Sequence, residues 1–109
     1  MKTALSYQYA HICNIVTANM HDLTAFQRDL LFVVAGKSKP AGVAIKDEIE
    51  EYYEKKIHYG RLYPNLDTLI DKGLVEKEKK DGRTNGYIIT NRGRRELQAR
   101  CDWENKYYN

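Results

Sequence analysis

Four polar residues near the middle of this 109-residue chain recur at the spacing of one helical face. At positions i, i+4, i+7 and i+11, they are Arg61, Asn65, Thr68 and Lys72. Arginine is the usual bidentate partner of guanine, asparagine is that of adenine, and threonine bonds to a base or a phosphate. A helix with this face is predicted to enter the major groove of DNA, although any solvated helix also has a polar face.

Basic residues gather in a segment directly after this helix. Two strand-like runs, 74–79 and 84–90, flank an Asp-Gly pair that is typical of a tight β-turn. A basic hairpin after a polar helix face predicts a winged helix-turn-helix whose hairpin lies along the phosphates, although lysines on an exposed strand also discourage aggregation. The residues expected to contact DNA from this side are Lys79, Lys80, Arg83, Thr84, Asn85 and Arg92.

Further helices must hold these residues in place. Thr24 and Gln27 have the spacing of a capping box, which predicts the start of a first helix that ends at Gly36. A second helix is expected to begin at Pro40, where the missing N–H costs nothing. Its inward-facing residues are expected to be Ile45, Ile49 and Tyr52.

The third helix is expected over 59–72 and a last helix over 91–107, capped by Thr90. Pro64 lies close enough to the start of the third helix to be tolerated, and Gly73 ends that helix. The buried stripe of the third helix is expected to be Leu62, Leu66, Leu69 and Ile70. The sequence therefore predicts a mainly α fold with a β-hairpin wing, of the α+β class.

A motif in the third helix is specific enough to point to a family. Residues 60–66 are Gly-Arg-Leu-Tyr-Pro-Asn-Leu, and Leu69 and Gly-Leu-Val at 73–75 follow. This pattern is similar to the G-x-L-Y-P-x-L-x-x-L-x-x-x-G-L-V signature of PadR-like transcriptional regulators. Residues 83–93 resemble the wing-to-helix junction of the same family. The resemblance covers residues 24–97 and is greater to small archaeal and viral members than to the longer bacterial ones.

The resemblance implies a homodimeric, sequence-specific repressor that binds double-stranded DNA at a near-palindromic operator. By position, the groove would receive Tyr59, Arg61, Tyr63, Asn65, Thr68 and Lys72. Many members have a small residue where this chain has Arg61 and an arginine near Thr68, so we expect an operator of its own. A winged helix that binds another protein is the alternative, but its third helix would expose apolar residues.

Apolar residues at both ends of the chain predict the dimer contacts. We expect an arm or helix over 1–22, the winged helix-turn-helix over 23–97, and the end of the last helix over 98–109. Large apolar stripes are a liability on a monomer, so a second copy is expected to cover them. Packing of the two end helices on each other within one chain is the alternative. The dimer residues are expected to be Leu5, Tyr9, Ile12, Val16, Leu97, Cys101, Trp103, Tyr107 and Tyr108.

Charge and hydropathy exclude several other classes of protein. The net charge is +3, and its excess is local, because 76–95 holds seven basic and three acidic residues. No apolar run approaches the about 18 residues that cross a membrane, and the first residues do not resemble a secretory signal. We therefore expect a soluble cytoplasmic protein with no membrane partner.

The sequence offers little for catalysis or metal binding. His11, Cys13 and His21 do not have the spacing of a metal site, and no nucleophile is paired with a base. We therefore expect no enzyme activity, no cofactor and no metal. The chain has nine tyrosines, which leaves open a small aromatic effector as a further ligand.

Overall fold

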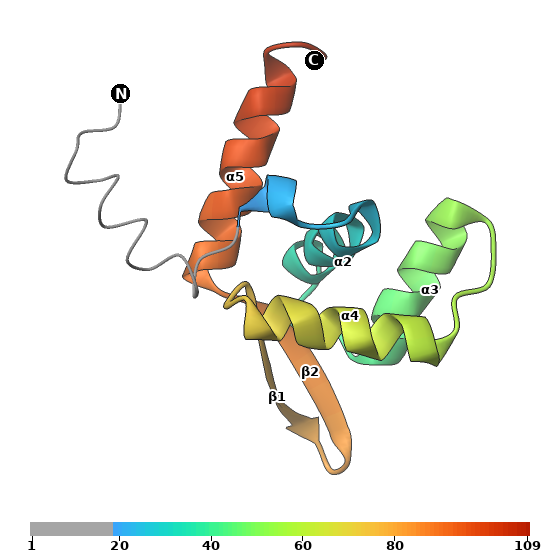
Figure 1. Cartoon of the computed structure of the whole chain (residues 1–109). Helices are drawn as coiled ribbons and strands as arrows, with labels where there is room; N and C mark the ends of the chain where they lie inside the picture. Colours follow the sequence, from blue (N-terminus) through green and yellow to red (C-terminus); the bar gives the residue numbers. More distant parts are fainter. Residues whose placement is uncertain (1–18) are drawn as a thin grey trace.

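The computed structural model describes residues 19–109 as four α-helices, one short 3₁₀ helix and a two-stranded antiparallel hairpin (Figure 1). In chain order they are η1 (Met20–Asp22), α2 (Ala25–Gly36), α3 (Gly42–Tyr53), α4 (Tyr59–Asp71), β1 (Val75–Asp81), β2 (Thr84–Ile89) and α5 (Asn91–Asn105). The predicted α+β class and element order are confirmed. Residues 1–18 of the predicted arm lie outside the described residues, and with them Leu5, Tyr9, Ile12, Val16, His11 and Cys13, while the last residues of the arm form η1.

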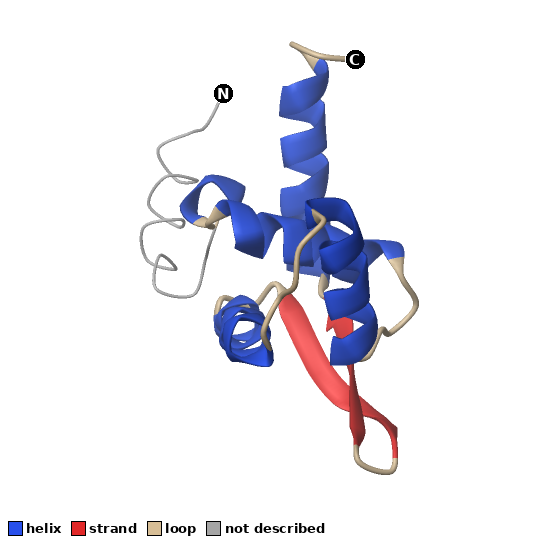
Figure 2. Cartoon of the chain, turned by 90° about the vertical axis from the view of Figure 1, so that its right-hand side faces the viewer, coloured by secondary structure: helices blue, strands red, loops and turns tan. Residues whose placement is uncertain are grey.

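The helices and the hairpin share one apolar core. The predicted stripe of α4 is confirmed, because Leu62, Leu66 and Leu69 are all 0% exposed, while Ile70 is half-buried. Two views at right angles place the hairpin and the C-terminal end of α5 at opposite ends of the molecule (Figures 1 and 2). The hairpin and the end of α5 are therefore free to contact different partners.

Both predicted caps are confirmed, and one of them joins two helices. Thr24 Oγ1 accepts from the Gln27 amide at 3.1 Å, and Gln27 Oε1 accepts from the Thr24 amide at 3.1 Å. At the start of α5, Thr90 Oγ1 accepts from the Gly93 amide at 3.0 Å. The same hydroxyl donates to the Gly73 carbonyl at 2.8 Å, which ties the start of α5 to the end of α4.

Two predictions about the second helix are wrong. Pro40 lies outside α3, which begins at Gly42, because the Pro40 carbonyl accepts from the Tyr87 amide at 2.9 Å instead of starting a helix. Tyr52 is 78% exposed rather than inward-facing. Its neighbour Tyr53 lies against the core instead and donates to Asp29 Oδ2 at 2.5 Å.

The turn before α3 contacts the outer half of the hairpin. The predicted hairpin is confirmed, since β1 and β2 pair from Val75–Ile89 to Asp81–Thr84. Its turn is Gly82-Arg83 rather than the Asp-Gly pair, and the register shifts between Lys79 and Asp81. Lys39 Nζ pairs with Glu78 at 2.7 Å, and Lys80 Nζ donates to the Lys39 carbonyl at 2.9 Å. A Cβ at Gly86 would meet Lys39 Cγ at 2.5 Å, so only glycine lets the turn cross the hairpin this closely.

Candidate nucleic-acid interface

The flank of α4 that faces α2 holds most of the predicted base readers. Asn65 Oδ1 accepts from Gln27 Nε2 at 3.0 Å, and Asn65 Nδ2 donates to the Arg61 carbonyl at 2.7 Å. Thr68 Oγ1 donates to the Pro64 carbonyl at 3.1 Å. Asn65 and Thr68 are half-buried, and their contacts with DNA stay a prediction. Helical spacing identified a polar flank but not what it contacts.

Arg61 is exposed, but it also lies against α2. Its guanidinium carbon is 4.0 Å from the centre of the Phe26 ring, which is a cation–π contact. Lys72, the fourth residue of the predicted face, is half-buried at the C-terminal cap of α4. The flank that faces α2 thus holds α4 against α2.

The opposite flank of α4 opens into a cleft of about 480 Å³ against the start of α3 and the hairpin. The structure brings together here four of the predicted DNA-binding residues, Tyr63, Arg83, Thr84 and Asn85. It adds residues that the sequence interpretation did not assign to DNA binding: Ala41, Gly42, Val43, Asp67, Lys77 and Tyr87. A polar cleft shared by two helices and a wing is therefore the candidate site.

The start of α3 gives this cleft the positive end of a helix. Ala41 is the N-cap and makes no side-chain cap, so the first amides of α3 have no side-chain partner. Tyr63 covers Gly42 so closely that a Cβ there would lie 2.5 Å from the Tyr63 hydroxyl. The ring of Tyr59 stacks on Tyr63 with centroids 5.5 Å apart. Two tyrosines of α4 thus border the uncapped end of α3.

Tyr87 forms part of the wall of the cleft. It is 3% exposed, and burial raises the pKa of its hydroxyl, with smaller contributions from Tyr63 and Asp67. Asp67, an exposed residue of α4, lines the same cleft. Its carboxylate therefore lies on the cleft side of the helix.

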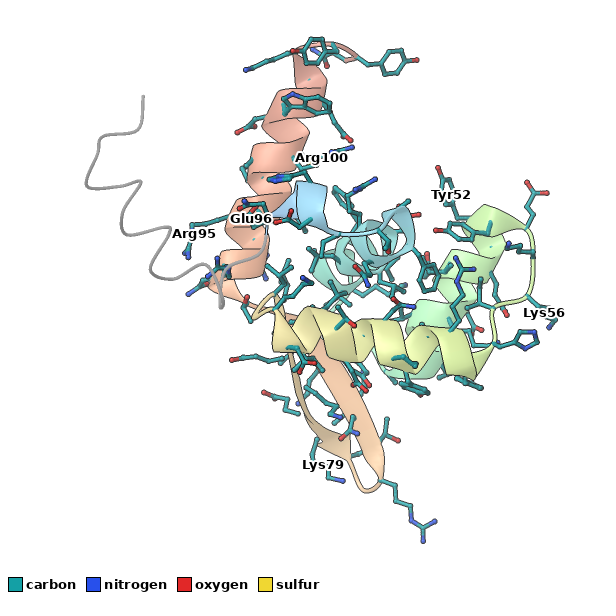
Figure 3. All side chains as sticks on the ribbon, in the orientation of Figure 1. Tyr52, Lys56, Lys79, Arg95, Glu96 and Arg100 are labelled. Atoms are coloured by element: carbon teal, nitrogen blue, oxygen red, sulfur yellow. The ribbon has the colours of Figure 1, made fainter. Side chains whose placement is uncertain are left out.

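The cationic side chains of the wing differ in whether they already bind another group of the chain. Among the described residues, no carboxylate pairs with Lys79 or Arg83, which are both exposed. Lys79 lies toward the end of the hairpin, far from Arg95 and Arg100 of α5 (Figure 3). The Lys80 ammonium is bonded to the Lys39 carbonyl, so its predicted phosphate contact competes with a structural one.

Arg92 lies beyond the wing, at the start of α5. It is half-buried, and its Nε is buried without a hydrogen-bond partner in the described part of the chain. The predicted phosphate contact of Arg92 is therefore restricted to the outer part of its guanidinium group.

Residues 30–99 match the family model of the Transcriptional regulator PadR-like family, which is more than half of the chain. The chain belongs to the PadR-like family. Its sequence is 47% identical to that of H. salinarum RosR, in a structure grown from NaBr. The match covers 83% of this chain and 82% of that one, with a TM-score of 0.76. Its sequence is 49% identical to that of hsRosR-S4, in a complex structure. This match covers 80% of this chain and 76% of that one, with a TM-score of 0.75.

A more distant solved structure shares only the fold with this chain. The chain is 19% identical to MarR, over 94% of this chain and 70% of that one, with a TM-score of 0.61. No curated protein matches the sequence. Together, the element order and these neighbours show that this PadR-like chain has a winged-helix fold, with β1 and β2 as the wing.

The far end of α5 in this PadR-like chain exposes aromatic rings. Trp103, Tyr107 and Tyr108 are 51%, 73% and 88% exposed, and they line a cleft of about 660 Å³. Cys101 is half-buried. Leu97, which was predicted to lie on a dimer stripe, is 7% exposed in the chain's own core. It is excluded from the candidate dimer surface, because its side chain already packs within the chain.

Residues 19–109 hold neither a metal cluster nor a membrane span. No three side chains among histidine, cysteine, aspartate and glutamate gather there as a metal site. No helix in that range is long and apolar enough to span a bilayer.

Proposed function

We propose that this chain is a sequence-specific DNA-binding regulator that acts as a homodimer and represses transcription at a near-palindromic operator. The observation that carries the proposal is the cleft that joins the start of α3, one flank of α4 and the wing. Membership of a family of transcriptional regulators supports it independently. The proposal assigns different contacts to the three elements around the cleft.

α4 enters the major groove with its N-terminal half and with the flank that faces the wing. Tyr59 and Tyr63 are 46% and 39% exposed on this part of the helix, where their rings and hydroxyls can meet sugar, phosphate or base. The uncapped amides of α3 bind a phosphate beside the groove, because a helix N-terminus favours an anion. The wing follows the backbone with Lys79, Arg83, Thr84 and Asn85.

Residues on the flank that faces α2 have a different role in this proposal. Arg61, Asn65 and Thr68 position α4 instead of reading bases, because Arg61 packs on the Phe26 ring and the side chains of Asn65 and Thr68 form hydrogen bonds within the chain. Base preference should therefore depend on the wing-facing flank and not on these three residues.

The dimer contact is assigned to the exposed rings of α5. Trp103 and Tyr107 lie with ring centroids 5.4 Å apart, at the end of the molecule opposite the wing. A second copy that covers these rings would let two reading helices contact half-sites about 34–36 Å apart. The contacts of Leu5, Tyr9, Ile12 and Val16 stay a prediction.

Light scattering tests the dimer with a matched pair of variants. We expect a dimer at micromolar concentration for the full chain and a monomer after combined Trp103→Ser and Tyr107→Ser. Tyr52→Ser removes another highly exposed tyrosine, on α3, and should stay dimeric. A monomeric full chain contradicts the homodimer, and a dimeric double variant moves the contact elsewhere.

Selection from a random duplex pool tests the DNA-binding function. We expect a near-palindromic consensus with one half-site per subunit, bound more tightly than unrelated duplex of equal length. A promoter fusion carrying that consensus should be less active when the chain is present, which tests repression. A chain that selects no consensus contradicts the proposed function.

Five finer predictions accompany this function. The chain is assigned to the small archaeal and viral members and to the cytoplasm, and neither a cofactor nor a catalytic activity is expected. An aromatic effector stays a prediction, which a thermal shift with flat aromatic acids would test.

A further inference from the structure

Asp67 is an acidic residue on a surface that otherwise suits a polyanion. It is exposed on α4, one turn after Tyr63, and it lines the same cleft as Lys77 and Arg83. Among residues 19–109, no hydrogen bond or ion pair engages its carboxylate. The carboxylate therefore has acceptor capacity that the fold does not use.

A carboxylate at this place weakens DNA binding unless the DNA supplies a donor. It is repelled by phosphates, and it loses water when α4 enters the groove. In the major groove, the donors that base edges present are the cytosine N4 and adenine N6 amino groups. Adenine places its N7 acceptor beside N6, where it faces the second carboxylate oxygen. Cytosine has no acceptor beside N4 on that edge, so it is the base that suits a carboxylate.

We propose that Asp67 determines part of the operator sequence by accepting a hydrogen bond from the N4 amino group of a cytosine in each half-site. This inference rests on the proposed function and adds a base to it. The carboxylate acts by exclusion as well as by attraction, because guanine and thymine present only acceptors to it in the groove. A charge that lowers affinity for most sequences thus raises discrimination among them.

Asparagine at this position gives a directed test. Asp67→Asn keeps the shape of the side chain but provides a donor and an acceptor, which match adenine N6 and N7. We expect the preferred base at one position per half-site to change from cytosine to adenine. We expect a change of about 10- to 100-fold in the ratio of the two affinities, the scale of one good base contact. Asp67→Ala should make that position indifferent.

Asp71→Asn is the matched control. Asp71 lies one turn further along α4, is also exposed, and does not line the cleft. Its substitution removes the same charge, so it should raise affinity for all duplexes slightly and leave the consensus unchanged. A melting curve for each variant shows that the fold is retained.

Selection from a random duplex pool with the four proteins decides the matter. The inference is supported by a wild-type consensus with cytosine that changes to adenine in Asp67→Asn alone. It is overturned if Asp67→Asn and Asp67→Ala keep the wild-type consensus, or if Asp71→Asn changes the same position. A wild-type chain that selects a consensus unaffected by Asp67 overturns this inference and leaves the proposed function standing. A wild-type chain that selects no consensus overturns both.

Discussion

The two flanks of α4 both carry polar groups, but they contact different surroundings. On the flank that faces α2, Asn65 bonds to Gln27 and Arg61 stacks on Phe26. On the flank that faces the wing, Asp67 has no partner among the described residues. Residue type and helical spacing therefore identify polar flanks, but the neighbouring elements decide which flank remains available to a ligand.

Gln27 explains why the flank that faces α2 is occupied. Its side chain is 9% exposed, and a buried amide must satisfy both its acceptor and its donor. The capping box uses Oε1, which accepts from Thr24, and leaves Nε2 without a partner inside α2. Asn65 supplies that partner from α4. A capping residue at the start of one helix thus fixes the rotation of another.

The largest expected effect is on the salt dependence of DNA affinity, which tests whether the wing contacts phosphates. If a dimer neutralises roughly 6–10 phosphates, affinity should fall by about 10³ to 10⁵ between 50 and 200 mM salt. Combined Lys79→Ala and Arg83→Ala should weaken binding to all duplexes, and lower the slope of log affinity against log salt by about 0.9 for each phosphate that is no longer neutralised. Titrations at four salt concentrations measure that slope.

Lys56→Ala is the control for this prediction. Lys56 is exposed beside α3, well away from the hairpin (Figure 3), so removing it should leave the salt slope unchanged. Equal slopes for the wild type and the double variant would contradict the assignment of the wing to phosphates.

The next effect tests whether Asn65 is structural. Asn65→Ala leaves Gln27 Nε2 buried without an acceptor, which should lower the free energy of unfolding by about 1–3 kcal/mol. Asn65→Asp keeps an acceptor and should recover part of that stability. Urea unfolding measures the stability, and duplex selection measures base preference, which should not change. A consensus altered at one position would restore Asn65 to the reading surface.

Local patterns in the sequence predicted the parts of the fold that depend on local interactions. The capping box, the Asp-Gly hairpin and the leucine stripe of α4 each involve residues a few positions apart. Errors arose where the partner is distant. The Pro40 carbonyl bonds to Tyr87, 47 positions away, and Gln27 bonds to Asn65, 38 positions away. Such pairs carry no periodic signal.

A similar ambiguity explains Tyr52 and part of the candidate site. Tyr52 and Tyr53 follow Ile49 by three and four positions, so both spacings place a residue near the inward face. The Asp29 carboxylate, which bonds to the Tyr53 hydroxyl, decides between them. In the same way, the sequence predicted Tyr63 and Arg83 at the interface, but the start of α3 joins them only in three dimensions.

A smaller effect is expected at Arg61. Arg61→Ala removes the contact with the Phe26 ring and should lower the free energy of unfolding by about 0.5–1 kcal/mol. Arg61→Lys keeps a cation near the ring and should be destabilised less. Neither variant should change the ratio of operator to non-operator affinity. A relaxed preference at one base pair would show that Arg61 reads a base and that both flanks of α4 take part in recognition.

The smallest effect concerns the alkaline stability of the α2 side. Burial, followed by the hydrogen bond to Asp29, raises the pKa of Tyr53 to about 12, while Arg61 acts in the opposite direction. The unfolded chain releases this proton near pH 10, so the folded state holds more protons between about pH 10 and pH 12. The contribution of Tyr53 to stability is therefore complete below pH 10 and is lost as the pH rises through that window.

The Tyr53→Phe chain lacks this proton, so wild-type stability should fall more steeply than that of the variant above pH 10. Urea unfolding from pH 8 to pH 11 measures the difference between the two curves, in which the other tyrosines and the lysines cancel. Parallel curves would contradict the raised pKa of Tyr53. DNA affinity at pH 7 should be the same for both proteins, because Tyr53 does not line the cleft that is proposed to bind DNA.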